Sequence, residues 1–436
     1  MRGPLLLAAG ILLGSLTASS QETLGAKSAT HESTTVLRFV SWKPDNPHAW
    51  DEALARFTEA YPRIRVVREI APHSSTAFHD LLTQKLKNHD PTVDLFLMDV
   101  VWVSEFAAAG WALPLDSLFP PSERIQFLPN TIEAGSYQGQ VYGVPLRIDS
   151  GMLYYRADLL RKYGFEPPQT WEELARQADI IVEGEAPTDP GLRGYSGQFK
   201  QYEGLVCNML EFIGSRGGQL ISQDGRQPAL ATPESLASVR FVRDHIIRRL
   251  ASRAVLTYQE PESLAVFVQG KAVFHRNWPY AWEVANNAER SAIAGKVGIA
   301  PLPRFPGGPS VAALGGWLYG ISAYSQHQNE AWQFISFFSS HEMQKFFAIK
   351  EALAPSRTAL YSDQDVLKAA PQFRDQFAVF QAATPRPRTP VYPAVSHILQ
   401  RYFSRALAFA DVDLEAEATS ADRQINRLLR LTGESF

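Results

Sequence analysis

A regular alternation of strand and helix patterns between residues 36 and 109 is the strongest constraint on the fold. The segments with strand patterns are 36–42, 64–70 and 93–98, and those with helical spacing follow at 49–61, 77–87 and 102–109. Strands that alternate with helices in this way predict a parallel sheet with helical crossovers. Ligands of such sheets bind outside the carboxyl ends of the strands, so residues 43–47 and Asp99 are candidates for a site.

The rest of the chain continues as an α/β sequence. Thr170 and Glu173 have the spacing of a capping box, which predicts a helix that begins at Trp171. Further strands are predicted at 152–155, 272–275 and 297–300, and further helices after Thr232-Pro233, at 260–269 and at 330–338. The last ~90 residues are mostly helical in pattern. A chain of 436 residues exceeds one ordinary core, so we expect two or more domains.

Composition excludes several classes of protein. The apolar content of 45% and charged content of 20% are typical of a globular chain. A net charge of −3 argues against a nucleic-acid partner, whose binding surfaces are basic. The ten histidines show no metal-ligand spacing, and the chain has no serine nucleophile elbow, P-loop or dinucleotide turn. We therefore predict no cofactor, no metal and no catalytic residue.

The first residues have the pattern of an export signal. Arg2, the apolar run 5–16 and the small residues 18–20 predict a signal peptide over 1–20, followed by a disordered lead-in over 21–35. The apolar run is too short for a comfortable membrane span. Cys207 is the only cysteine, so no cysteine is present near the cleavage site to carry a lipid anchor. We expect an exported, periplasmic protein, with an extracellular location as the alternative.

Two segments combine tryptophan with a backbone that we expect to be bare or turning. They are Leu314-Gly315-Gly316-Trp317-Leu318 and Asn277-Trp278-Pro279-Tyr280. A tryptophan ring can lie against the C–H face of a sugar, and glycines allow a close approach of the backbone. The alternative is that both tryptophans are core residues behind tight turns.

The chain resembles the extracellular solute-binding proteins of ABC sugar importers, and in particular the trehalose/maltose-binding group. The matching segments are 94–99 with Trp102, 142–145, 149–156, 201–205, 270–274, 277–280, 315–317 and 386–390. The resemblance implies a two-lobed periplasmic-binding-protein fold with a hinge and a ligand cleft between the lobes. It implies an N-lobe of 36–148 plus 298–345, a C-lobe of 149–297 plus 346–436, and hinge crossings near 146–149 and 297–300.

The resemblance also implies a sugar ligand, membrane permease subunits as partners, closure of the hinge on binding, and a monomer. In its cleft, Trp278 and Trp317 would stack on sugar rings, and Gly315 and Gly316 would offer backbone N–H groups. Tyr280 would donate a hydrogen bond or simply pack.

The polar candidates each have an alternative. Asp99 and Asp149 would accept sugar hydroxyls, although Asp99 suits a helix N-cap and Asp149 a turn. Glu203 would face the cleft or cap a helix, and Asn46 would line the N-lobe wall with Trp42 and Asp45.

The arginines leave the ligand open. Arg386 would be the fork-shaped donor to neighbouring hydroxyls, with Arg388 as its competitor. Arg147 stands where an aromatic residue is expected in related binding proteins, so a differently shaped or acidic ligand is possible. The alternatives to a disaccharide are glucosylglycerol and a glycerol phosphodiester held by Arg147, Arg386 and Arg388. A glycoside hydrolase that uses Asp99 and Asp149 and an adhesive surface protein are the rival classes.

Overall fold

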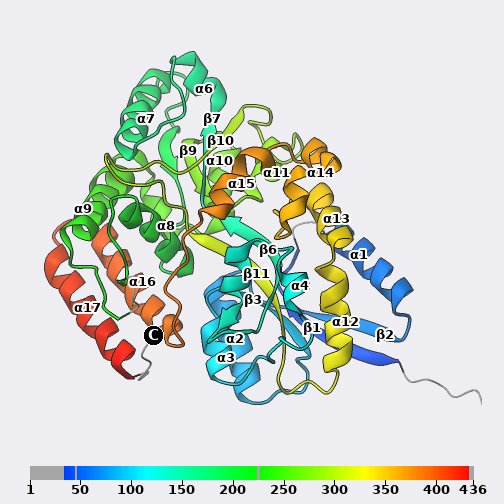
Figure 1. Ribbon diagram of the computed structural model, residues 1–436. Coiled ribbons are helices and arrows are strands. Elements are labelled where there is room, and N and C mark those ends of the chain that lie inside the picture. The colour runs from blue at the N-terminus through cyan, green and yellow to red at the C-terminus, as the bar shows by residue number, and fades with distance from the viewer. Residues whose placement is uncertain (1–33, 45–46, 223–225, 432–436) are drawn as a thin grey trace, which may run out of the picture.

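The chain forms two lobes, each built around its own β-sheet (Figure 1). The computed structural model describes residues 34–44, 47–222 and 226–431. The predicted signal peptide and most of the predicted lead-in lie outside this range. Thr35, which we had placed in the lead-in, is the first residue of strand β1.

The first lobe holds a five-stranded sheet with the order β2-β1-β3-β11-β6. Its strands are β1 (Thr35–Ser41), β2 (Ile64–Ile70), β3 (Leu95–Asp99), β6 (Val144–Ser150) and β11 (Leu314–Ile321). β1 is parallel to β2 and β3, as the alternating pattern predicts, whereas β11 is antiparallel to both β3 and β6. The helices and hairpin of this lobe are α1 (Pro47–Ala60), α2 (Ser75–Lys87), α3 (Val103–Ala108), α4 (Pro121–Arg124), α5 (Pro129–Ala134), β4 (Ser136–Tyr137), β5 (Gln140–Val141), α12 (Gln328–Phe338) and α13 (His341–Glu351).

The second lobe holds a four-stranded sheet with the order β10-β7-β9-β8. Its strands are β7 (Met152–Arg156), β8 (Arg193–Ser196), β9 (Ala272–Asn277) and β10 (Val297–Ala300). Its helices are α6 (Ala157–Lys162), α7 (Trp171–Glu185), α8 (Glu203–Gly214), α9 (Pro233–Phe241), η1 (Val242–Leu250), η2 (Arg253–Thr257), α10 (Glu260–Val268), α11 (Ala281–Asn286), α16 (Tyr392–Ala408) and α17 (Leu414–Leu431). The capping box at the start of α7 is formed as predicted, since Thr170 and Glu173 satisfy each other's backbone N–H groups.

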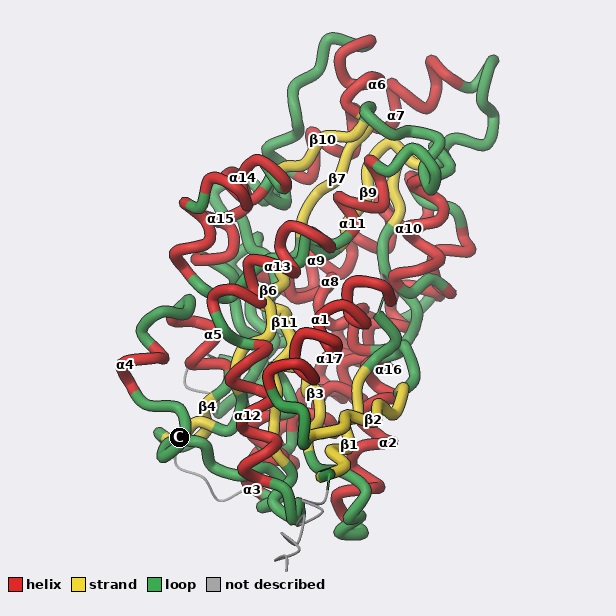
Figure 2. Tube along the Cα trace, turned by 90° about the vertical axis from the view of Figure 1, so that its right-hand side faces the viewer, coloured by secondary structure: helices red, strands yellow, loops and turns green. Residues whose placement is uncertain are grey.

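Three stretches of chain connect the lobes. β6 leads into β7 through Gly151, residues 301–313 lead from β10 into β11, and residues 382–391 lead from α15 (Phe373–Gln381) to α16. η3 (Thr358–Ser362) and α14 (Gln364–Ala369) precede α15. Figure 2 shows β6 and β11 lying between the strands of the second sheet and those of β1, β2 and β3.

Strand pairing and aromatic packing correct two of the expected lobe boundaries. β10 pairs with β7 in the second sheet, so the chain crosses after Ala300 and not at 297–300. The aromatic side chains of α13 pack into the first core, where Phe347 lies 4.8 Å from the Trp50 ring, although we had assigned 346–436 to the C-lobe. Both errors concern contacts between distant parts of the chain, which local patterns do not encode.

Gly151, at the first crossing, has no room for a side chain. A Cβ atom built there would lie 2.0 Å from Oε1 of Glu211 and 2.8 Å from Nη2 of Arg276. Both of those side chains are buried. The crossing is therefore held against a rigid, charged part of the second lobe.

We predict that Gly151→Ala lowers the free energy of unfolding by about 1–3 kcal/mol, because overpacking forces buried groups to move. Gly191→Ala is the matched control, since the nearest heavy atom to its Cβ would be 3.4 Å away. Chemical denaturation of the three proteins measures the difference. Equal stabilities of the two variants would contradict the packing at Gly151.

Candidate ligand-binding site between the lobes

A cavity of about 110 Å³ lies between the two lobes. Nine of the ten predicted site residues line it: Asp99, Asp149, Glu203, Trp278, Tyr280, Gly315, Gly316, Trp317 and Arg386. Asn46 and Asp45 lie outside the described residues. The structure thus brings together the carboxyl ends of β3 and β6 and the amino end of the antiparallel β11 in one lobe with helix and strand ends in the other.

Arg386 connects the two lobes through a pair of carboxylates. Its Nη2 atom donates to Oδ1 of Asp99 at 2.9 Å, and its Nη1 atom donates to Oε1 of Glu203 at 2.8 Å. Asp99 ends β3 in the first lobe, whereas Glu203 begins α8 in the second. Burial opposes the charge of Arg386, but these carboxylates outweigh it and raise the pKa of the guanidinium well above its ordinary value.

Neither carboxylate is the N-cap residue of the helix that follows it, and their role as ligand acceptors stays a prediction. The helix after Asp99 begins at Val103 with Trp102 as its N-cap, so Asp99 does not cap it. Glu203 does not cap α8 either, because its side chain accepts hydrogen bonds from Arg386, Tyr392 and Ser396. Both carboxylates therefore belong to one buried network.

Arg388 lies in a different place from Arg386. It pairs with Glu133 at 2.6 Å and donates to the backbone oxygen of Ser136, and its side chain is 36% exposed. It lines a larger outer groove of about 1200 Å³, which Arg386 also borders. Of the two arginines, Arg386 is therefore the one in the inner cavity.

A second charged pair lies on β6. Nε of Arg147 is 3.0 Å from Oδ2 of Asp149, and the Arg147 guanidinium lies over the Trp42 ring at 5.0 Å. Burial raises the pKa of Asp149, which the charge of Arg147 opposes. Asp149 stands within a strand opposite Gly315 and not in a turn.

The two predicted tryptophans face the cavity from opposite lobes. Trp317 is backed by Phe78, whose ring is stacked on it at 5.6 Å, and by Trp42 and Trp102. Trp278 is backed by the guanidinium of Arg276 at 3.9 Å, and its Nε1 donates to Oε1 of Glu260 at 3.1 Å. Both rings are half-buried, so each is fixed from behind while part of it borders the cavity.

The two glycines lie in strand β11 and not in the bare or turning segment that we expected. A Cβ at Gly315 would lie 3.1 Å from Cζ3 of Trp278, so this glycine lets that ring approach the first sheet. Gly316 has a φ of 135°, and a register shift follows between Trp317 and Leu318. Packing thus explains both glycines, and their N–H groups as ligand donors stay a prediction.

Sequence reasoning did not place several residues of the cavity. They are His73, Ser75, Gly204, Cys207 and Glu260, whereas Lys43, Trp42 and Arg147 were expected near the ligand and do line the cavity. The start of α10 was predicted, but nothing in the pattern indicated that Glu260 would hold the Trp278 indole. Cys207 is buried, and burial raises the pKa of its thiol to about 12.

The comparisons with known proteins identify the family. The model of the bacterial extracellular solute-binding proteins matches residues 42–345. A probable ABC transporter-binding protein of Deinococcus radiodurans is 38% identical over 319 residues, which are 73% of this chain and 75% of that protein. The chain therefore belongs to the bacterial extracellular solute-binding protein family, and it is the substrate-binding component of an ABC transporter.

Solved structures agree with this assignment. T. maritima MalE3 with bound maltose has a TM-score of 0.83 and 35% identity, and the match covers 91% of this chain and all of that chain. A ribitol-bound solute-binding protein of Agrobacterium radiobacter K84 has a TM-score of 0.82 at 22% identity, covers 91% and 99%, and shows the fold alone. Among the helices of the described residues, none has the length and apolar character that crossing a membrane requires.

We predict that Arg386→Met lowers the free energy of unfolding by about 3–5 kcal/mol, because it leaves two buried carboxylates without their shared cation. Arg388→Met, the control two residues away, removes an exposed ion pair and should cost less than about 1 kcal/mol. Chemical denaturation without added sugar measures both. Similar losses in the two variants would show that the buried network contributes little.

Proposed function

We propose that this protein binds a neutral disaccharide or α-glucoside of the trehalose or maltose type in the cavity between its lobes. It acts in the periplasm and delivers the sugar to the permease subunits of its importer. The observation that carries the proposal is the pair Trp278 and Trp317, which border one cavity from opposite lobes. Aromatic faces supply apolar contact to sugar rings, and the carboxylates around them accept hydroxyl hydrogen bonds. The maltose bound to T. maritima MalE3 supports this class of ligand.

Binding of such a ligand requires the lobes to move. Pockets for ligands of drug size measure about 300–1,000 Å³, whereas the inner cavity measures about 110 Å³. The lobes must therefore separate to admit a disaccharide and then close around it. When the lobes separate, Asp99 and Glu203 move apart, and Arg386 can no longer contact both of them. Sugar hydroxyls would then compete with Arg386 for hydrogen bonds to these two carboxylates.

The charges of the cavity favour a neutral ligand. The lining of the cavity includes four carboxylates and three cations. They are Asp99, Asp149, Glu203 and Glu260 on one side of the balance, and Lys43, Arg147 and Arg386 on the other. Both arginines are already within ion-pair distance of carboxylates, and Arg388 lies in the outer groove. A phosphodiester would therefore have to displace existing pairs, which makes the anionic ligand the second candidate.

A glycoside hydrolase is the less favoured class, because the relatives are solute-binding proteins. Asp99 and Asp149 are each engaged by an arginine, and neither is placed as a free general acid or base. Recovery of intact disaccharide after incubation supports binding alone, whereas release of glucose would favour the enzyme.

The first test is a thermal-shift screen of the protein with trehalose, maltose, sucrose, glucosylglycerol, glucose and glycerophosphocholine. A ligand that binds the folded state raises Tm by mass action, and we expect the rise with one α-glucoside. Trp317→Ala should weaken its binding at least about 10-fold, or ~1.4 kcal/mol, because a stacking surface is lost. Trp332→Ala, which removes a tryptophan outside the cavity, should leave the Kd unchanged. No shift with any neutral ligand would overturn the proposal.

Salt dependence separates the two ligand classes. We expect the Kd of the sugar to change less than about 2-fold between 50 and 500 mM NaCl, because a neutral ligand gains nothing from exposed charge attraction. Isothermal titration at both concentrations measures it. A Kd that rises several-fold with salt, together with binding of glycerophosphocholine, would favour the anionic ligand.

A further inference from the structure

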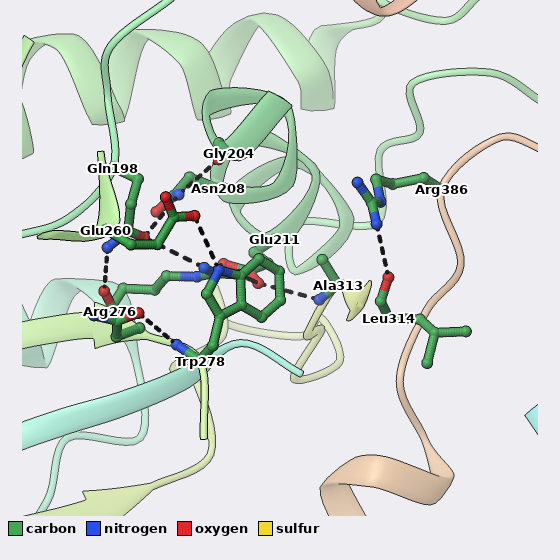
Figure 3. Close-up of polar contacts among 11 residues, drawn as sticks. Gln198, Gly204, Asn208, Glu211, Glu260, Arg276, Trp278, Ala313, Leu314 and Arg386 are labelled. Atoms are coloured by element: carbon green, nitrogen blue, oxygen red, sulfur yellow. Dashed lines mark hydrogen bonds and ion pairs between the residues drawn. The ribbon is translucent and has the colours of Figure 1, made fainter. Parts of the chain in front are cut away.

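A buried ion pair lies directly behind the Trp278 ring (Figure 3). Arg276 donates from Nε to Oε2 of Glu211 at 2.8 Å and from Nη2 to Oε1 at 2.5 Å, and both side chains are 1% exposed. Its third nitrogen, Nη1, donates to Oε1 of Gln198 at 3.3 Å. The guanidinium is thus fixed in its plane by partners on two other segments, with the indole lying across its face.

The same pair contacts two of the three chain crossings between the lobes. The backbone N–H of Ala313, just before β11, donates to Oε1 of Glu211 at 3.1 Å. Gly151, between β6 and β7, lies so close to both side chains that a Cβ atom would overlap Glu211. Each crossing adjoins a strand of the first sheet, β6 before Gly151 and β11 after Ala313, whereas Arg276 and Glu211 belong to β9 and α8 of the second lobe.

Trp278 also has a contact of its own with the first lobe. Its ring reaches Gly315, two residues after Ala313 in the chain. The ring, the ion pair and the two crossings therefore form one continuous set of contacts that runs from the cavity wall to the hinge. Movement of the Trp278 ring toward the second core would displace the guanidinium stacked on it, because protein interiors are close-packed.

We propose that Arg276 and Glu211 are positioning residues that couple the Trp278 ring to the two crossings at Gly151 and Ala313. Contact of a ligand with the ring and the distance between the lobes then depend on each other. The part that concerns the ligand rests on the proposed function, since it requires sugar to lie on Trp278. The part that concerns the lobes holds without any ligand.

A buried ion pair that merely filled the second core would stabilise the fold without affecting the lobes. Two variants separate these roles. Glu211→Gln with Arg276→Met removes both charges together, which avoids a single uncompensated buried charge, and the new amide oxygen can still face Ala313. Arg276→Lys keeps the charge beside Glu211 but loses the planar face that stacks on Trp278.

The experiment measures the distance between the lobes and the affinity in the same proteins. Spin labels are placed at Glu59→Cys on α1 and Glu183→Cys on α7, both exposed positions. The native Cys207 should not take a label, because it is buried and burial raises the pKa of its thiol to about 12. Ile425→Ala, which opens the second core at helix α17, is the control for lost stability. Pulsed electron paramagnetic resonance gives the distribution of distances between the two labels. It is recorded without sugar and with saturating maltose or the sugar selected in the thermal-shift screen.

We expect the double variant to broaden the distance distribution without sugar, to reduce the sugar-induced change in mean distance by at least half, and to raise the Kd about 10-fold. We expect Arg276→Lys to raise the Kd while the distribution without sugar stays as narrow as in the wild type. Distributions in the double variant that match those of Ile425→Ala would overturn the coupling, even with a raised Kd. If the wild type binds no sugar in the screen, the proposed function fails, and the distribution without sugar still decides whether the pair holds the crossings.

Discussion

The arrangement of the lobes depends on the need to neutralise one buried cation. Arg386 is 4% exposed, and its two carboxylate partners come from different lobes. Burying an arginine is tolerable only when carboxylates with good geometry surround it. The lobes therefore meet where Asp99 and Glu203 can both reach the guanidinium, and the cavity walls take their positions from that meeting point.

The glycines at the interface follow from the same closeness. Gly151 and Gly315 let backbone at the edge of the first sheet approach side chains of the second lobe. A methyl group at Gly151 would overlap Glu211, and one at Gly315 would lie 3.1 Å from the Trp278 ring. The lobes are consequently joined through the wall of the candidate site. A hinge built in this way transmits small displacements of a side chain to the strands, because the contacting atoms are close-packed.

Local patterns predicted the elements but not how distant elements meet. The parallel start of the first sheet and the capping box at Thr170 depend on neighbouring residues, and both were predicted correctly. The pairing of β10 with β7 and the packing of α13 on α1 are non-local, and the boundaries drawn near 297 and 346 were wrong for that reason. Gly315 and Gly316 were misjudged because two glycines resemble a turn, whereas here they permit close packing inside a strand.

The candidate site was predicted largely from residues at strand and helix ends, which the structure gathers around one cavity. Arg386 and Arg388 could not be separated by sequence, since they alternate with prolines in a segment without periodicity. Arg276 and Glu211 were missed because each lies among buried neighbours, in β9 and in α8, where a charged residue gives no sign of its partner.

The packing at Gly151 has an evolutionary consequence. A larger residue at this crossing is acceptable only if Glu211 or Arg276 is replaced by a smaller residue, and a smaller residue at position 276 would remove the guanidinium behind Trp278. The hinge and the aromatic wall of the cavity are therefore expected to change together between relatives. A change in ligand preference would then require Gly151, Glu211, Arg276 and Trp278 to change together. Sequences in which only one of the four has changed would be less stable.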